Sequence, residues 1–265
     1  FTTVGHMKIL LLGFGSIGRH IVRLLDHEFT AMVRDIAAHR ERGTHGVRLI
    51  TEQHFEKALG EADLVVEAAG VSVAKAFLPR VNKPFVLTSV GALADPITAE
   101  ALMTPHLHVT NGAIGGFDVL EAVADQLDHV SITTSKAPTG LIQPWMSQSE
   151  ANRLEELTEA ETIFTGNPID AIEIFPGNVN VAVALAYATR GSKPLTTSLE
   201  RVKVQLVADP VRTDSAHLVE VSGEAGKFKF EFVSSPSPIN PATSGTTALS
   251  LAATIRRLEP HIRRG

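Results

Sequence analysis

Apolar runs alternate with helix-compatible segments in the first part of the chain. The run at 8–12 is followed by a segment, 16–25, whose apolar residues recur at intervals of about 3.6 residues, as in an amphipathic helix. Further apolar runs of strand length stand at 29–33, 64–70, 85–89 and 108–110, and helical patterns stand at 55–59 and 73–78. Strands that alternate with helices are typical of parallel βαβ units. We therefore expect an N-terminal Rossmann-type α/β domain built on a parallel sheet.

Beyond residue 116 a different pattern begins. Residues 227–232 alternate strictly between polar and apolar side chains, which predicts a half-buried strand. Further strands are expected at 130–135, 202–209 and 217–221, and helices at 119–127, 149–157 and 179–188. Antiparallel strands with one polar face suit a second, α+β domain with a mixed or antiparallel sheet. The predicted domains are 7–116 and 117–242, and a C-terminal helix at about 243–262 is expected to pack back on the first domain.

Three glycines separate the first predicted strand from the first helix. Gly13, Gly15 and Gly18 have the G-x-G-x-x-G spacing, in which the first allows a tight turn, the second lets a pyrophosphate approach the backbone and the third lets helix and strand pack closely. The phosphates of such a ligand rest on the positive N-terminus of the helix, where Ser16 and Ile17 stand. This pattern makes 7–116 a predicted dinucleotide-binding domain; a purely structural glycine turn is the alternative.

The ends of the next strands supply further candidate cofactor contacts. Asp35 is placed to bind the ribose hydroxyls of NAD, whereas Arg34 and Arg40 are placed to accept the 2′-phosphate of NADP, so we expect use of either cofactor. A solvated charged turn is the alternative at this position. Ala68 and Ala69 follow the strand at 64–67, and ligands of parallel sheets bind at the carboxyl ends of the strands.

The second half of the chain has fewer residues whose pattern suggests catalysis or ligand binding. His217 begins a predicted strand, and its imidazole can exchange protons near neutral pH. Two asparagines, Asn178 and Asn180, enter an apolar helix; one is explained as a helix cap, and the other is a candidate to hold a cofactor amide. The glycine-rich stretch 111–116 fits either close approach to a ligand or a domain hinge. The segment 237–244 fits either a polar loop that caps the last helix or a carboxylate site.

Composition excludes several classes of function. The chain has 265 residues, 44% of them hydrophobic, a formal net charge of −5 and no cysteine. The charge speaks against nucleic-acid binding, and the lack of cysteine excludes thiol chemistry and thiolate metal sites. Of the 11 histidines, none has the neighbours of a metal site. We expect a cytoplasmic protein without a membrane segment or signal peptide, and we expect Met7 to be the first native residue.

The motifs together resemble one family, the L-aspartate dehydrogenases. The resemblance covers nearly the whole chain from Met7 and is carried by the glycine motif at 13–18 and by the segments 111–116, 135–138, 175–182, 208–210, 217–226 and 236–244. It implies NAD(P)-dependent oxidative deamination of L-aspartate to iminoaspartate, which feeds NAD biosynthesis or hydrolyses to oxaloacetate and ammonia. It also implies a homodimer, with His217 as the active-site histidine and with Ala113 and Asn180 as contacts of the nicotinamide cofactor.

Residues for the two carboxylates of the substrate are inferred from their chemistry. Lys136 is the first candidate because a carboxylate needs a cationic partner, and the hydroxyls of Thr243 and Ser244 are candidate donors. Two other kinds of function remain open. The first is a related imine or carbonyl reductase, such as a dihydrodipicolinate reductase or a homoserine dehydrogenase. The second is a non-catalytic NAD-binding sensor. Formation of NAD(P)H with a small panel of amino acids discriminates between them, because a sensor binds the cofactor without turnover.

Overall fold

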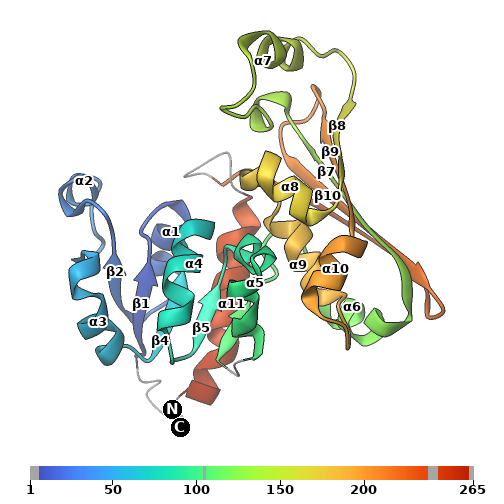
Figure 1. Ribbon diagram of the computed structural model, residues 1–265. Coiled ribbons are helices and arrows are strands. Elements are labelled where there is room, and N and C mark those ends of the chain that lie inside the picture. Colours follow the sequence, from blue (N-terminus) through green and yellow to red (C-terminus); the bar gives the residue numbers. More distant parts are fainter. Residues whose placement is uncertain (1–5, 104–105, 238–243, 263–265) are drawn as a thin grey trace. The chain divides into compact units, whose positions relative to one another are not determined.

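The chain is divided into two compact units. The computed structural model describes residues 6–103, 106–237 and 244–262 (Figure 1). One unit comprises Phe1–Thr110 with Thr247–Gly265, and the other comprises Asn111–Thr246. The first unit therefore ends at Thr110 rather than at residue 116, and the glycine-rich stretch 111–116 belongs to the second unit.

A parallel sheet forms the centre of the first unit. Among the described residues it has six strands in the order β3-β2-β1-β4-β5-β6, the order of a Rossmann fold, and all neighbouring strands are parallel. Its strands are β1 (Lys8–Leu12), β2 (Glu28–Met32), β3 (Arg48–Ile50), β4 (Leu64–Glu67), β5 (Phe85–Leu87) and β6 (Leu107–Val109). The continuous apolar runs of β1 and β4 are explained by burial on both faces of the sheet.

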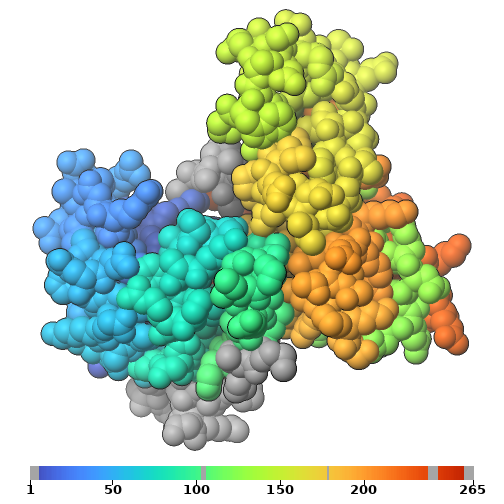
Figure 2. All heavy atoms as spheres, viewed as in Figure 1, coloured from blue at the N-terminus to red at the C-terminus, as the bar shows by residue number. Residues whose placement is uncertain are grey.

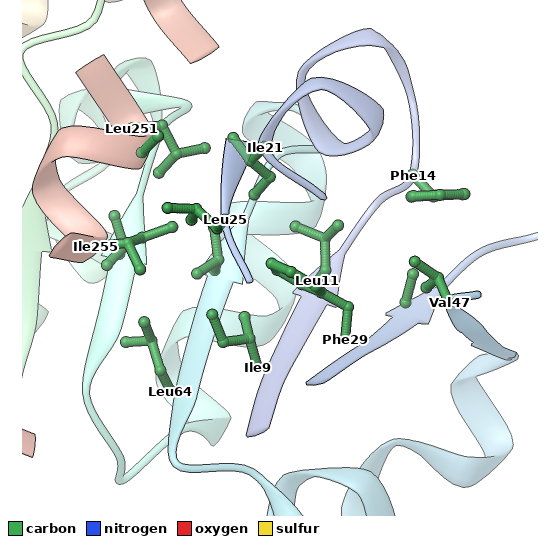
Figure 3. Packing of buried hydrophobic residues seen from close by; sticks show 14 of the residues in the cluster. Ile9, Leu11, Phe14, Ile21, Leu25, Phe29, Val47, Leu64, Leu251 and Ile255 are labelled. Atoms are coloured by element: carbon green, nitrogen blue, oxygen red, sulfur yellow. The ribbon is translucent and has the colours of Figure 1, made fainter. Parts of the chain in front are cut away.

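The last helix of the chain completes the core of the first unit. The helices of this unit are α1 (Ser16–Leu24), α2 (Ile36–Glu41), α3 (Phe55–Glu61), α4 (Val71–Phe77), α5 (Pro96–Ala99) and α11 (Gly245–Ile262). Leu251 and Ile255 of α11 lie in one cluster with Ile21 of α1 and with Ile9 and Leu11 of β1 (Figure 3). Because side chains alternate across a strand, α1 and α11 cover the same face of the sheet.

The second unit is built on a mixed sheet. Its strand order among the described residues is β11-β10-β7-β9-β8, in which only the pair of β7 and β9 is parallel. Its strands are β7 (Leu127–Lys136), β8 (Glu161–Gly166), β9 (Lys203–Ala208), β10 (Ser215–Gly223) and β11 (Gly226–Ser234). Together the two sheets confirm the predicted fold class, a Rossmann-type α/β unit followed by an α+β unit.

The second unit also contains helices. They are α6 (Phe117–Val123), α7 (Gln148–Glu155), α8 (Pro168–Ile174), α9 (Asn180–Ala188) and α10 (Leu195–Arg201). Helices α8, α9 and α10 lie beside one another along the sheet (Figure 1). Helix α9 is apolar on all sides because it is almost wholly buried. In the part of the chain that the structure describes, no helix is long and apolar enough to cross a membrane.

Candidate functional site

The glycine motif forms a tight turn at the end of β1. Gly13 has φ +97°, and a Cβ atom there would lie 2.6 Å from Cβ of Ala69 and 2.9 Å from the carbonyl oxygen of Ala68. A Cβ at Gly18 would lie 2.8 Å from the carbonyl oxygen of Gly13. Both positions therefore require glycine, one for its backbone conformation and both for close packing.

Gly15 differs from its two neighbours in the motif. Nothing lies within 4 Å of a Cβ built on Gly15, so its surface is open. Gly15 is also the N-cap of α1 and has no side chain with which to cap the helix. The first N–H groups of α1, which begin at Ser16 and Ile17, therefore face an open cradle with the positive end of the helix dipole behind it. These residues fit the pyrophosphate of a dinucleotide.

The end of β2 carries the residues expected to distinguish NAD from NADP. The N–H of Val33, just after β2, donates to the carbonyl oxygen of Ile50 in β3, and the next residue, Arg34, is exposed. The Asp35 carboxylate caps α2 by accepting a hydrogen bond of 3.0 Å from the Ala38 N–H. None of the six residues of α2 is buried, and the helix stands on the surface of its unit (Figure 2). One oxygen of Asp35 thus has a structural role as the cap of α2.

Arg19 ties helix α2 to the glycine turn. Its guanidinium lies 4.5 Å from the ring centroid of Phe14, inside the glycine motif, and donates to the carbonyl oxygens of Arg42 and Gly43 beyond α2. Burial lowers the pKa of Arg19, and the charges of Arg42 and Arg23 lower it further. Arg19 therefore fixes the segment after β2, in which Arg34, Arg40 and Arg42 outnumber Asp35 and Glu41 and supply cationic groups that suit a phosphate.

Ala68 and Ala69 lie where the sequence predicted, beyond β4 and against the turn at Gly13. The preceding residue, Glu67, is a buried polar residue that the sequence analysis did not single out. It is wholly buried at the carboxyl end of β4. Its only sequence signal is an acidic residue inside the apolar run 64–69.

His217 and Thr134 form a buried pair in the second unit. The strands β10 and β7 place them opposite each other, and Nδ1 of His217 lies 2.9 Å from Oγ1 of Thr134. His217 is 3% exposed and Thr134 is 1% exposed. In the tautomer whose Nδ1–H donates to Thr134, Nε2 of the imidazole is the proton acceptor. Thr134 is a second residue that the sequence analysis missed.

Lys136 stands on the same face of the sheet as this pair. It follows Thr134 by two positions on β7, so its side chain is directed to the same side. Burial, and then the charge of Lys136, lower the pKa of His217 to about 3. Burial also lowers the pKa of Lys136. His217 is therefore a neutral imidazole at neutral pH, and an anion near Lys136 would raise its pKa.

A cavity opens beside Lys136. Its volume is about 340 Å³, and it is lined by Lys136, Ala137, Thr139, Gly140, Thr213, Asp214, Ser215 and Pro236. One ammonium, three hydroxyl groups and the Asp214 carboxylate belong to this lining, and Asp214 forms an ion pair of 2.7 Å with Arg212. The ammonium and the hydroxyl groups are the donors that suit a small dianionic ligand.

The remaining predicted site residues of this unit lie on other elements. Ala113 belongs to the loop before α6, where Gly115 and Gly116 pack against the rings of Phe232 and Phe230. This packing is a structural reason for those two glycines, distinct from both predicted explanations. Asn180 is the first residue of α9, whose N-cap is Val179, so Asn180 is not the helix cap.

Ser244 directly precedes the last helix, α11. Ser244 pairs with Pro236 in an isolated bridge, and its hydroxyl oxygen lies 2.7 Å from Oγ1 of Thr246. The Ser244 hydroxyl therefore already takes part in local hydrogen bonding. Thr243 lies outside the described residues. No group of three or more His, Asp or Glu side chains among the described residues could hold a metal ion.

Comparisons with known proteins match the chain over nearly its whole length. The sequence profile of a family described as "Aspartate dehydrogenase, C-terminal" matches residues 118–258. An L-aspartate dehydrogenase of Methanopyrus kandleri is 31% identical in an alignment 288 residues long, which covers 98% of this chain and 98% of the relative. An L-aspartate dehydrogenase of Brucella anthropi is 32% identical over 269 residues, covering 93% of this chain and 94% of the relative.

Solved structures agree with these matches. The crystal structure of aspartate dehydrogenase from Thermotoga maritima is similar with a TM-score of 0.73 at 25% identity, covering 97% of each chain. Aspartate semialdehyde dehydrogenase II from Vibrio cholerae is similar with a TM-score of 0.51 at 12% identity, which supports the fold alone. The matches include both units of the chain.

Proposed function

Since this chain belongs to the aspartate dehydrogenase family, we propose that it oxidises L-aspartate to iminoaspartate with NAD or NADP. It is an oxidoreductase, as its relatives are. The observation that carries the proposal is the placement of His217 and Lys136 on one sheet face, where Lys136 also lines a polar cavity. This arrangement combines a proton acceptor with a cationic group for a dicarboxylate substrate.

The substrate carboxylates are assigned to the cavity beside Lys136. The Lys136 ammonium is its cation, and the hydroxyls of Thr139, Thr213 and Ser215 are additional donors. Charge-assisted hydrogen bonds of this kind are stronger than neutral ones, and they select for anionic side chains. This supports aspartate over alanine, which lacks the second carboxylate. Ser244 and Thr243 remain predicted donors to the substrate.

His217 is assigned the role of general base and acid. Oxidation removes a hydride from Cα of aspartate and a proton from its nitrogen, and the bound nicotinamide supplies the acceptor for the hydride. The amine must be neutral before the hydride leaves, so a base must take a proton from the ammonium. Burial, and then the charge of Lys136, lower the pKa of His217. A substrate carboxylate beside Lys136 offsets the second of these causes and so raises the pKa of His217, the group assigned to accept that proton. The same imidazole activates the water that hydrolyses the imine.

The cofactor is assigned to the glycine turn and its neighbours. Gly13, Gly15, Ser16, Ile17 and Gly18 hold the pyrophosphate in this proposal. The other cofactor contacts are Arg34, Asp35, Ala68 and Ala69 in the first unit and Ala113 and Asn180 in the second. Arg34 and the cationic segment around α2 support binding of the 2′-phosphate of NADP, and the second oxygen of Asp35 supports binding of NAD.

The absorbance of the reduced nicotinamide tests the reaction. Purified protein is mixed with NAD or NADP and L-aspartate at mildly alkaline pH, with glutamate, alanine and homoserine as alternative substrates. Reduction with aspartate alone is the expected result. Reduction with another substrate but not with aspartate would reassign the chain to a related reductase, and cofactor binding without any reduction would favour a sensor. Replacement of His217 by Ala should lower turnover by roughly 10²–10⁴-fold while cofactor binding is retained.

Cofactor choice is tested by Arg34→Ala. The KM for NADP should rise roughly 10-fold because a charge-assisted contact to the 2′-phosphate is lost, while the KM for NAD should stay within about twofold. Arg48→Ala is the control, since Arg48 is an exposed arginine on β3 that pairs with Glu61.

The proposal also includes a homodimer, which light scattering during size-exclusion chromatography tests.

A further inference from the structure

A buried carboxylate joins two loops at the carboxyl edge of the parallel sheet. Glu67 is the last residue of β4 and is completely buried, although the rest of the strand is apolar. Burying a charge is costly unless hydrogen bonds satisfy it. The surroundings of Glu67 must therefore supply those bonds.

Four donors surround the Glu67 carboxylate. Oε1 accepts from the N–H of Ala69 at 2.7 Å, from the N–H of Gly70 at 2.8 Å and from the hydroxyl of Ser89 at 3.0 Å. Oε2 accepts from the N–H of Ser89 at 2.8 Å. Burial raises the pKa of Glu67, and these donors act in the opposite direction. Three of the four donors are backbone N–H groups, which can only donate, so the pattern suits the ionised carboxylate.

These bonds fix the loops that follow two adjacent strands. Ala69 and Gly70 connect β4 to α4, and Gly70 has φ +126°, a conformation that favours glycine. Ser89 follows β5 and is the N-cap of the 3₁₀ helix η3 (Val90–Ala94). One side chain therefore sets the distance between the β4 loop and the β5 loop.

A third loop depends on the same carboxylate through packing. Ala69 lies so close to Gly13 that a Cβ on Gly13 would be 2.6 Å from Cβ of Ala69. The Glu67 carboxylate accepts a hydrogen bond from the N–H of Ala69, and Ala69 in turn borders the glycine turn at Gly13. The loops after β1, β4 and β5 are thus linked at the edge where dinucleotides bind to this fold.

We propose that Glu67 is a positioning residue for the dinucleotide: it holds these three loops in the arrangement that binds the cofactor, without itself touching the cofactor. The inference rests on the proposed use of NAD(P). Glu67→Gln isolates the effect, because the amide keeps an oxygen for Ala69, Gly70 and the Ser89 hydroxyl but turns an NH₂ group toward the N–H of Ser89. Two donors then face each other, and the backbone hydrogen bond that fixes the β5 loop is lost.

The dissociation constants of NADH and NADPH, measured by the fluorescence of the reduced nicotinamide, test the proposal. Glu67→Gln should raise the tighter of the two constants roughly 10- to 100-fold, while the KM for aspartate at saturating cofactor stays within about threefold. Saturating cofactor should restore most of kcat. Glu61→Gln is the matched control, since this exposed carboxylate of the same unit pairs only with Arg48 among the described residues.

Ser89→Ala is the second variant, because it removes one hydroxyl donor and leaves the backbone bond from Ser89 intact. It should raise the dissociation constant by about threefold. If Glu67→Gln unfolds, an unchanged constant in Ser89→Ala overturns the proposal. A folded Glu67→Gln variant with wild-type cofactor affinity also overturns it. Both readouts are binding constants and do not depend on turnover. A wild-type protein that binds NADPH without oxidising aspartate would therefore refute the proposed reaction. The cofactor affinities of the variants would still decide the role of Glu67.

Discussion

Oγ1 of Thr134 lies 2.9 Å from Nδ1 of His217, and both side chains are buried at opposing positions of two antiparallel strands. This hydrogen bond fixes the plane of the imidazole. It also determines which ring nitrogen is available for proton transfer, because the bonded nitrogen is engaged with Thr134. The activity assigned to His217 therefore depends on a hydroxyl that has no chemistry of its own in the reaction.

Replacement of Thr134 by Val should lower kcat/KM for aspartate roughly 10-fold. Valine keeps the shape of threonine but leaves Nδ1 without its buried partner, so the ring loses its fixed orientation and tautomer. Steady-state kinetics and the pH profile of kcat/KM measure the effect. Thr133→Val is the matched control: Thr133 is the neighbouring residue on the opposite face of β7, where its hydroxyl donates to Gln205. Equal losses in the two variants would contradict a special role for Thr134.

The low pKa of His217 predicts a loss of stability in acid. The unfolded chain binds a proton at His217 below a pH of about 6.5, whereas the folded chain binds it only below a pH of about 3. Between these values the unfolded state holds more protons, so the free energy of unfolding falls as the pH falls, by at most about 1.4 kcal/mol per pH unit from this group.

The variant His217→Asn should lack this contribution. Urea unfolding of the wild type and of the variant at a series of pH values measures the difference in the free energy of unfolding. The difference should shrink as the pH falls from about 6.5, and it should be constant at higher pH. Parallel curves throughout would show that His217 is protonated equally in the folded and unfolded chains.

Replacement of Lys136 by Met should raise the KM for aspartate roughly 10- to 100-fold. Methionine keeps most of the apolar stem but removes the charge that the substrate carboxylates are proposed to meet. Removing this charge also removes one cause of the low pKa of His217, so the pKa of His217 should rise. Lys203→Met is the control, because Lys203 is an exposed lysine on the neighbouring strand β9. An unchanged KM would move the carboxylate site away from this cavity.

Replacement of Gly13 by Ala should abolish cofactor binding and destabilise the first unit by about 2–4 kcal/mol. The new Cβ would overlap Ala69, and φ is +97°. Gly60→Ala is the matched control, since Gly60 lies in helix α3 with nothing within 4 Å of an added Cβ. That change should stabilise the protein by about 0.5 kcal/mol. Thermal unfolding and titration with NADH measure both effects, and normal binding by Gly13→Ala would contradict the assigned turn.

The sequence by itself determined the features that arise from neighbouring residues. The apolar run at 8–12, the glycine spacing at 13–18 and the period of the following segment predicted a strand, a turn and a helix, because each follows from local backbone conformation and side-chain periodicity. The strict alternation at 227–232 likewise predicted β11. Strand β8 was missed because it is a short edge strand, most of whose residues are partly exposed, without a marked alternation.

Tertiary structure decided what the functional groups meet. Thr134 and His217 are 83 residues apart, and their hydrogen bond exists because β7 pairs with β10. The carboxylate of Glu67 is satisfied by Ser89 of another strand end, and the glycines at 115 and 116 are required by phenylalanine rings of β11. None of these contacts can be inferred from a spacing along the sequence, because each joins residues that only the folded chain brings together. The chemistry of each side chain was therefore readable from the sequence, whereas its partner, burial and pKa were set by the fold.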